Sequence, residues 1–263
     1  MDIQNLMQAL LASFIYTGTR YFIVAGAIFL LFYGLLKRVL VSRKIQENFP
    51  KLKDYRRDIF YSVLSMGIFS VVSYITLVTL GSYNNVYWHI EEFGLPYFLF
   101  TFIWMFFLHD TYFFWSHRLI HHPKIYKHVH LIHHRATNPT PWSAYAFHPI
   151  EAVVEGGIVT VIAFLIPVHG VAINAYMLFQ IGYNVYAHLG YEILPANTNR
   201  HWLGKWISTS VSHNMHHQYF RHNYGLWTTI WDRLMNTLHP DYDAVFERTT
   251  RTQRSEVAIA SEV

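Results

Sequence analysis

Long apolar runs separated by short polar connections make up most of the chain before Tyr191. Three of these runs are long enough to cross a bilayer as helices, which takes about 20 residues. They cover residues 21–41, 59–80 and 95–115. A shorter interfacial helix is expected ahead of the first run, over residues 6–16. Two further runs, 152–168 and 171–189, are separated only by His169 and Gly170 and predict a tight helical hairpin or a re-entrant pair.

The charged residues orient these runs. The connection between the first two runs is rich in lysine and arginine, whereas the connection between the second and third has only Glu91 and Glu92 as charged residues. Basic connections stay on the cytoplasmic side of a membrane. The third run is therefore expected to end in the cytoplasm and to deliver His117 there. The hairpin leaves that side and returns to it, so we expect everything after Tyr191 to be cytoplasmic too.

Composition also indicates a membrane protein. Apolar residues make up 52% of the chain and charged residues only 14%, whereas soluble domains carry roughly a quarter charged residues. The formal charge of +4 is modest and the basic residues are clustered, which favours anionic lipid headgroups over nucleic acid as neighbours. Because the chain contains no cysteine, disulfides and thiolate metal ligands are excluded.

These patterns predict an all-α integral membrane protein. We expect about four transmembrane or re-entrant helices with a helical cap on the cytoplasmic side. Residues 1–243 are expected to form a single membrane domain. Residues 244–263 are polar and rich in Arg, Thr and Ser, so they are expected to form a frayed C-terminal tail.

The chain has eighteen histidines, and eight of them fall into three clusters. The clusters are His117 with His121, then His130 with His133 and His134, and finally His213 with His216 and His217. Positions i, i+3 and i+4 share one face of a helix, so each cluster aims its imidazoles at one point. Imidazole suits iron, zinc, copper or nickel. One zinc ion takes three or four protein ligands, so eight histidines favour a site for two metals within residues 110–232.

Two common metal motifs do not fit this pattern. A His-Glu-x-x-His zinc hydrolase needs a glutamate where Arg118, Leu119 and Ile120 lie, and soluble di-iron bundles need Glu-x-x-His pairs, which the sequence lacks. An almost all-histidine site remains, and nearby carboxylates are expected to orient its rings. For each carboxylate, a role in helix capping or in a salt bridge is an equally good alternative. The candidates are Asp110, Glu151, Glu192 and Asp232.

Several stretches beside the histidines carry a family resemblance. They are Asp110–Arg118, Pro139–Glu151, Asn223–Gly225 and Trp231–Arg233. Together with the three clusters they cover about residues 95–240, and they resemble the fatty acid hydroxylase and sterol desaturase superfamily. Within it the pattern is most similar to sterol C5-desaturases (lathosterol oxidases) and to bacterial members, and the bacterial likeness favours a bacterial inner membrane over the endoplasmic reticulum.

The resemblance implies an enzyme with two iron ions and molecular oxygen as co-substrate. It implies desaturation or hydroxylation of an unactivated C–H position in a sterol-like or acyl lipid, as part of lipid biosynthesis. Two electrons would come from a separate cytochrome b5-like or ferredoxin-like protein. The implied ligands are the eight clustered histidines and His188, with His201 as a further possible ligand. His148 and Asn223 match the family at pocket positions, beside the four carboxylates.

One alternative remains beside the enzyme, namely a non-catalytic metal-binding membrane protein that acts as a sensor or transporter. Transporters place their polar ligands near the middle of the bilayer, whereas these clusters fall at the ends of the apolar runs. Iron binding with oxygen consumption distinguishes the enzyme from both. The substrate, the oxidised position, the electron donor and the oligomeric state are not given by the sequence.

Overall fold

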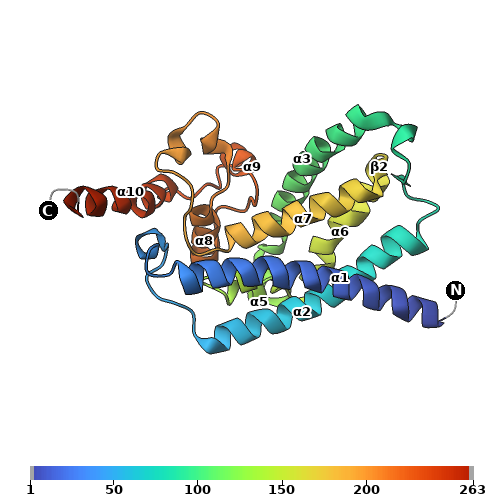
Figure 1. The fold of residues 1–263 in the computed structure, drawn as a ribbon, viewed down its shortest axis with the longest axis horizontal. Helices are drawn as coiled ribbons and strands as arrows, with labels where there is room; N and C mark the ends of the chain where they lie inside the picture. Colours follow the sequence, from blue (N-terminus) through green and yellow to red (C-terminus); the bar gives the residue numbers. More distant parts are fainter. Residues whose placement is uncertain (1–2, 261–263) are drawn as a thin grey trace.

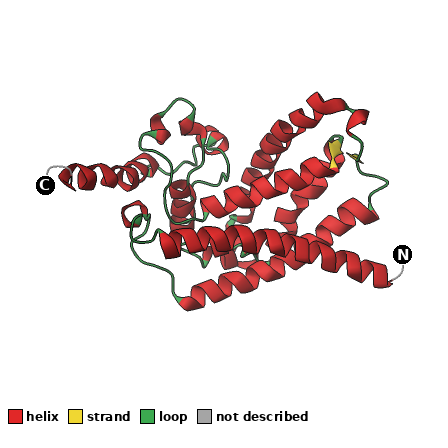
Figure 2. Ribbon diagram, viewed as in Figure 1, coloured by secondary structure: helices red, strands yellow, loops and turns green. Residues whose placement is uncertain are grey.

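A computed structural model describes residues 3–260 of the chain, with side chains through residue 251, and its regular secondary structure is helical apart from two short strands (Figure 2). Three long segments are apolar enough to cross a membrane: Ile3–Leu35, Leu52–Thr79 and Gly94–Ile120. The first consists of α1 (Ile3–Phe29) and the π-helical η1 (Leu30–Leu35), and the second of α2 (Leu52–Tyr74) and the π-helical η3 (Ile75–Thr79). The third is α3 (Gly94–Ile120). The predicted all-α membrane class is confirmed.

The first segment differs from its prediction. One continuous helix begins at Ile3, so the separate interfacial helix expected over residues 6–16 does not form. No proline interrupts this stretch, and Thr17 and Gly18 are buried on the side that faces α2. A Cβ atom added at Gly18 would lie 3.7 Å from the Met66 sulfur, so the small residue lets the two helices approach closely.

The expected hairpin forms, but its two helices pack against different partners. α6 (Pro149–Leu165) packs mainly on α2, and α7 (Gly170–Ala187) packs mainly on α1 (Figure 1). A short parallel pair joins their turn to the end of the second span, with β1 (Val86–Tyr87) beside β2 (Val168–His169). His148 and His169 cap α6 and α7, because each Nδ1 accepts a hydrogen bond from the backbone N–H two residues later.

The remaining elements are short apart from α10, and all but η4 form the cap beyond the end of α3. They are η2 (Val41–Arg43), η4 (Ile90–Glu92), α4 (Pro123–Val129), α5 (Leu131–His134), η5 (Pro141–Tyr145), η6 (Thr198–Arg200), η7 (Gly204–Trp206), α8 (Ser210–Tyr219), α9 (Ile230–Leu234) and α10 (Tyr242–Ala260). Of these, η4 alone lies at the opposite end, just before α3 begins. α8 lies beside the end of α7 and against α10 (Figure 1).

The C-terminal segment is not the frayed tail that was expected. It forms α10, whose Tyr242 and Phe246 are buried against Val211 and Met215 of α8. Tyr242 and Phe246 are four residues apart and so lie on one face of the helix, although the segment is polar overall. This apolar face is enough to pack the helix against α8. The expectation is therefore wrong for residues 244–251, and the side chains beyond 251 lie outside the described residues.

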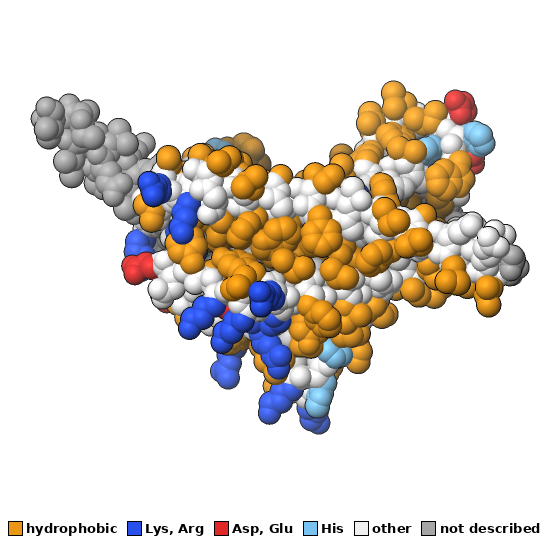
Figure 3. Space-filling model, turned by 60° about the horizontal axis from the view of Figure 1, so that its bottom comes forward, with side chains coloured by type: hydrophobic (Ala, Val, Ile, Leu, Met, Phe, Trp, Pro, Cys, Tyr) orange, Lys and Arg blue, Asp and Glu red, His pale blue; other side chains and the backbone are white. Residues whose placement is uncertain are grey.

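The surface of the long helices carries large exposed apolar side chains. Leu30, Phe60 and Ile103 are exposed by 62%, 64% and 58%, respectively. Figure 3 shows hydrophobic side chains across most of one face, with lysine and arginine gathered along one edge. Exposed apolar area of this extent needs an apolar environment, so the surface agrees with a bilayer around the three spans.

Candidate metal centre

Nine histidines form two adjoining groups around the C-terminal end of the third span, α3. One group contains five histidines and the other four, and within each group the ligand nitrogens all lie within 4.8 Å of one another. The first group is His117, His121, His130, His134 and His216, and the second is His133, His188, His213 and His217. All nine are buried except His121, which is half-buried.

Local helix geometry divides the clusters between the two groups. His117 and His121 lie at the end of α3, one turn apart, and both join the five-histidine group. The neighbours His133 and His134 end α5, and because successive helical residues point about 100° apart, they face different groups. α8 repeats this arrangement, with His216 in the five-histidine group and His217 in the other.

Hydrogen bonds fix the proton position on four of the nine rings. Nδ1 of His117 donates to the Tyr224 carbonyl over 2.7 Å, and Nδ1 of His216 donates to the His222 carbonyl over 2.6 Å. Nδ1 of His188 donates to the Asn184 carbonyl over 2.8 Å. Nδ1 of His130 donates to the Glu151 carboxylate over 2.6 Å. In a neutral imidazole the other nitrogen then carries a lone pair, so these four Nε2 atoms are free to bind a metal.

The spacing of the Nε2 atoms fits a bound cation. Nε2 of His117 lies 3.0 Å from Nε2 of His130, and the Nδ1 partners of both rings leave a lone pair on each Nε2. Two acceptors at that distance repel each other, whereas a cation between them attracts both. His121, His134 and His216 form a triangle of Nε2 atoms with sides of 3.1 Å. The donor set therefore fits metal ions bound by imidazole.

Burial keeps these rings in the neutral form that binds metal. Burial first, and then repulsion from neighbouring imidazoles, lowers the pKa of His213, His216 and His217 well below the usual range. Burial lowers the pKa of His188 to about 4. At neutral pH the rings thus carry no proton that a metal would have to displace.

The two groups differ in how firmly their rings are held. In the five-histidine group, three rings have an Nδ1 partner. In the four-histidine group His188 has one, whereas the buried Nδ1 atoms of His213 and His217 find no partner among the described residues. Partners of this kind orient a ligand and raise its basicity, so the five-histidine group is the more rigid of the two.

Of the four candidate carboxylates, Glu151 contacts one of the grouped histidines, and the others hold the segments around the site. Asp110 accepts hydrogen bonds from the Thr228 backbone N–H and hydroxyl, at 3.0 and 2.6 Å. Glu192 accepts from the N–H groups of Leu194 and Val211, both at 3.0 Å.

Asp232 supports the site through the backbone of one loop. It accepts hydrogen bonds from the N–H groups of Tyr224 and Gly225, at 2.9 and 2.8 Å, and from the Thr237 hydroxyl at 2.7 Å. This holds the loop whose Tyr224 carbonyl orients His117. Asp232 therefore supports the orientation of His117 indirectly, through the backbone of this loop.

The other predicted site residues lie away from the two groups. Asn223 is buried and holds two backbones together, since its amide donates to the Ser212 carbonyl and its oxygen accepts from the His239 N–H. His148 caps α6, as described above. His201 is exposed, and its Nδ1 accepts hydrogen bonds from the N–H groups of Leu203 and Gly204. The structure thus brings together the nine main candidates and leaves His148 and His201 outside.

The sequence did not reveal the backbone acceptors that orient the rings. Every residue has a backbone carbonyl, so residue type does not show which carbonyls accept from a histidine ring. Only the fold identifies those of Asn184, His222 and Tyr224. His109 lies two turns before His117 on the same helix and belongs to neither group. It is buried, with Nδ1 3.2 Å from the Tyr176 hydroxyl.

The segment that carries these histidines matches a known family. Residues 102–237, just over half of the chain, match the fatty acid hydroxylase family model. The chain belongs to this family. The predicted membership of the fatty acid hydroxylase and sterol desaturase superfamily is confirmed. No solved structure matches the chain.

Relatives of the chain within this superfamily include named sterol enzymes. The chain is 30% identical over 246 residues to the Delta(7)-sterol 5(6)-desaturase of Leptosphaeria maculans. The matched region covers 87% of this chain and 63% of the relative. It is 31% identical over 185 residues to the lathosterol oxidase of Homo sapiens, covering 68% of this chain and 59% of the relative. It is 26% identical over 233 residues to the Delta(7)-sterol 5(6)-desaturase of Candida glabrata, covering 85% and 61%.

These matches span less than two thirds of each relative's own length. They come from fungi and a mammal, so they lend no support to the expectation of a bacterial inner membrane.

Proposed function

We propose that this fatty acid hydroxylase family member is a membrane oxidoreductase that uses molecular oxygen to desaturate or hydroxylate an unactivated C–H position of a sterol-like or acyl lipid. The observation that carries the proposal is the convergence of nine histidine nitrogens into two groups. The names of the relatives support a lipid substrate. We place the reaction in lipid biosynthesis, with its site on the cytoplasmic side of the membrane.

We propose iron as the metal, with one ion in each group. His121, His134 and His216 would hold one ion together with the rest of the five-histidine group, and the four-histidine group would hold the other. Five histidines exceed what a tetrahedral zinc site takes. Imidazole is a good ligand for iron.

When bound, iron would supply the redox chemistry that activates oxygen. The chain's own residues hold and shield the site. Glu151 and the three backbone carbonyls keep the ring nitrogens aimed inward. Phe147 packs against His133 with ring centroids 5.0 Å apart, and Phe113 packs against His117 at 4.9 Å. These two aromatic rings exclude water from the membrane side of the histidines.

We propose that the lipid approaches along an apolar groove between α3 and α7. Two adjoining hollows of about 530 and 440 Å³ share Phe106 and Phe107, and their lining is almost wholly apolar. Hollows of this size suit a lipid-sized ligand. Trp227 lines the groove, and its ring centroid lies 5.8 Å from that of Phe113, the residue that covers His117.

Each turnover needs two electrons from outside the chain, since oxygen takes four and the C–H substrate yields two. We propose that a separate cytochrome b5-like or ferredoxin-like protein delivers them from the cytoplasmic side. Lys51, Lys53 and Arg56 are exposed at the start of α2 on that side. They would attract an acidic carrier by long-range steering.

Metal content and oxygen consumption test this proposal together. The protein is purified in detergent after expression with ample iron, its metals are counted by mass spectrometry, and oxygen uptake is followed with a chemical reductant and lathosterol. We expect two irons per chain and lipid-dependent uptake. A protein that holds only zinc and consumes no oxygen contradicts the enzyme and favours a metal sensor or transporter.

A further inference from the structure

Large apolar side chains lie exposed on one side of the cap. Five of them, which we call the cap patch, come from the segment around η7 and from α9, namely Trp202, Leu203, Trp206, Ile207 and Leu234. Trp202 and Leu234 are exposed by 68% and 62%, respectively. Exposed apolar side chains gathered in this way are unfavourable in water and mark an interaction site.

The backbone that carries the tip of the cap patch is held rigidly. The His201 ring accepts hydrogen bonds from the N–H groups of Leu203 and Gly204, both at 3.3 Å. A Cβ atom added at Gly204 would clash with the Thr198 carbonyl oxygen, so only glycine allows the turn to pack this tightly. Because this turn is fixed, Trp202 and Leu203 stay on the surface and do not fold back onto the cap.

The cap patch continues into the lipid-facing surface of the third span. Trp206, Ile207 and Leu234 line the larger hollow of the groove together with Phe106 and Phe107 of α3. Phe107 is itself exposed on the membrane-spanning helix. Figure 1 shows α9 beside α3 at this junction. One apolar surface therefore runs from the span onto the cap.

Tryptophan and basic side chains surround this junction. Trp115 is half-exposed near the end of α3 and packs edge-on against Trp231 of α9, with ring centroids 5.6 Å apart. The Arg118 guanidinium lies 5.8 Å from the centre of the Trp115 ring, and the Lys205 ammonium lies 5.0 Å from that of Trp206. Tryptophan is enriched where a bilayer meets water, and basic side chains there extend toward the headgroups.

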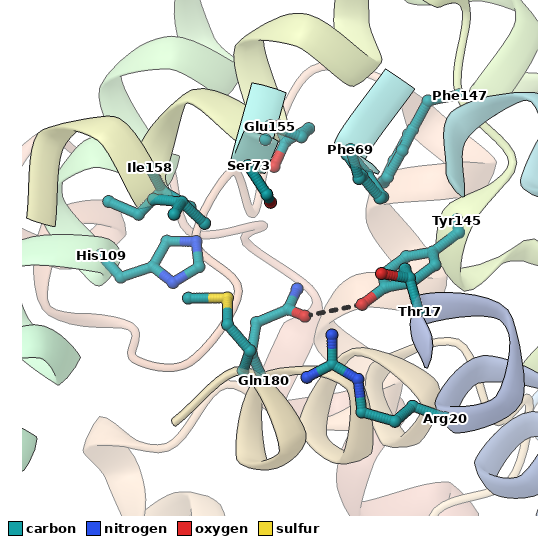
Figure 4. Close-up of a pocket in the computed structure, with 13 residues that line it drawn as sticks. Thr17, Arg20, Phe69, Ser73, His109, Tyr145, Phe147, Glu155, Ile158 and Gln180 are labelled. Carbon is teal, nitrogen blue, oxygen red and sulfur yellow. Dashed lines mark hydrogen bonds between the residues drawn. The ribbon is translucent and has the colours of Figure 1, made fainter. Parts of the chain in front are cut away.

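The groove beside the cap patch offers little to water. None of the described residues that line its larger hollow is charged. Both hydroxyl groups in that lining are bonded within the protein, since Tyr183 donates to a backbone carbonyl and Thr228 to the Asp110 carboxylate, each over 2.6 Å. Charged groups lie instead in a separate cavity of about 70 Å³ between the spans, which Arg20 and Glu155 line (Figure 4). The mouth of the groove therefore suits acyl chains better than water.

We propose that the cap patch is embedded in the bilayer interface, in the leaflet where α3 ends. Its apolar side chains lie among the upper acyl chains, and Lys205 extends to a lipid phosphate. Interfacial elements of this kind insert about 5–10 Å into the boundary between headgroups and acyl chains. The mouth of the groove then opens within the bilayer, so a lipid enters it without crossing water. The docking of the cap does not depend on the oxidation proposed above.

A protein partner fits this surface less well. The cap patch shares one hollow with Phe106 and Phe107 of a membrane span, so a soluble protein that covered the whole surface would have to enter the bilayer. The bilayer already surrounds the span and covers both parts without a break.

Spin labels on the protein in a bilayer test the proposal. Because the chain contains no cysteine, Leu203→Cys and Leu234→Cys each take a single nitroxide label. Ile103→Cys, at an exposed site within the third span, is the reference for lipid, and the exposed Asp241→Cys is the reference for water. The whole chain is placed in phosphatidylcholine nanodiscs. Electron paramagnetic resonance then measures relaxation by oxygen, which concentrates among acyl chains, and by a nickel chelate, which stays in water.

We expect oxygen to relax the labels at positions 203 and 234 more strongly than the nickel chelate does, as at position 103. The label at position 241 should show the reverse order. Labels on the cap patch that respond mainly to the nickel chelate lie in water, which overturns the proposal. Labels that respond to neither reagent are covered by protein, which overturns it as well. Because no turnover is measured, either result is independent of the proposed function.

Discussion

Glu151 accepts a hydrogen bond of 2.6 Å from Nδ1 of His130, which ties helix α6 to the five-histidine group. Both side chains are buried to 1% exposure. The carboxylate holds the ring with its Nε2 toward the metal and increases the basicity of that nitrogen. Glu151 is thus the one acidic side chain among the candidates that contacts a grouped histidine.

Replacing Glu151 by glutamine should weaken one metal site and spare the other. We expect the metal affinity of the five-histidine group to fall about 10- to 100-fold. About one iron per chain should then be lost at a lower chelator concentration than in the wild type. Metal content after dialysis against increasing chelator measures this. Glu91→Gln, at an exposed site, is the control. Equal retention by both variants would show that the hydrogen bond does not support metal binding.

Histidines inside and outside the two groups should behave differently. His188→Ala removes one of four ligands from its group and is expected to leave about one iron per chain. His201→Ala changes an exposed ring that caps a turn, so its iron content should equal that of the wild type. Metal analysis of the two purified variants decides the matter. Iron loss in the His201 variant would place this residue among the ligands.

Much of the metal centre could be predicted from the sequence because its signal is local. The spacing of His117 and His121, and the repeated spacing in the other two clusters, follows directly from helix geometry. The division into two groups was not predictable, since it depends on how α3, α5 and α8 are turned relative to one another. His188 came from family resemblance alone, because a lone histidine after an apolar helix has no pattern of its own.

The fold was predictable where hydrophobicity alone decides it. The three spans follow from run length, whereas the continuous start of α1 and the docking of α10 depend on tertiary contacts of Gly18 and Phe246.

The metal-free protein should lose stability as the pH falls below about 6.5. Burial lowers the pKa of His188 from 6.5 to about 4, and burial also lowers the pKa of His213 and His217 well below its usual range. Between pH 6.5 and pH 4 these histidines bind protons in the unfolded chain but not in the folded chain. Stability is therefore greatest above pH 6.5 and declines toward pH 4. Thermal unfolding of metal-free protein across this range measures the decline. A midpoint that stays constant until carboxylates titrate would contradict it.

Asp232 should matter for stability through the loop it holds. Asp232→Ala leaves the N–H groups of Tyr224 and Gly225 without their acceptor in a buried setting. We expect a loss of about 2–6 kcal/mol in unfolding free energy, from about 1–3 kcal/mol for each of the two orphaned groups. Denaturant unfolding in detergent measures it, with the exposed Asp241→Ala as the control. If both variants match the wild type, the loop is held by other contacts.

Untargeted lipid mass spectrometry tests lipid oxidation most directly. Cells that lack this protein are supplied with the wild type, with His133→Ala, or with His201→Ala, at matched expression. We expect one lipid class to lose two hydrogens or gain one oxygen with the wild type and with His201→Ala, and to remain unchanged with His133→Ala. Identical lipid profiles from all three would contradict lipid oxidation by this metal centre.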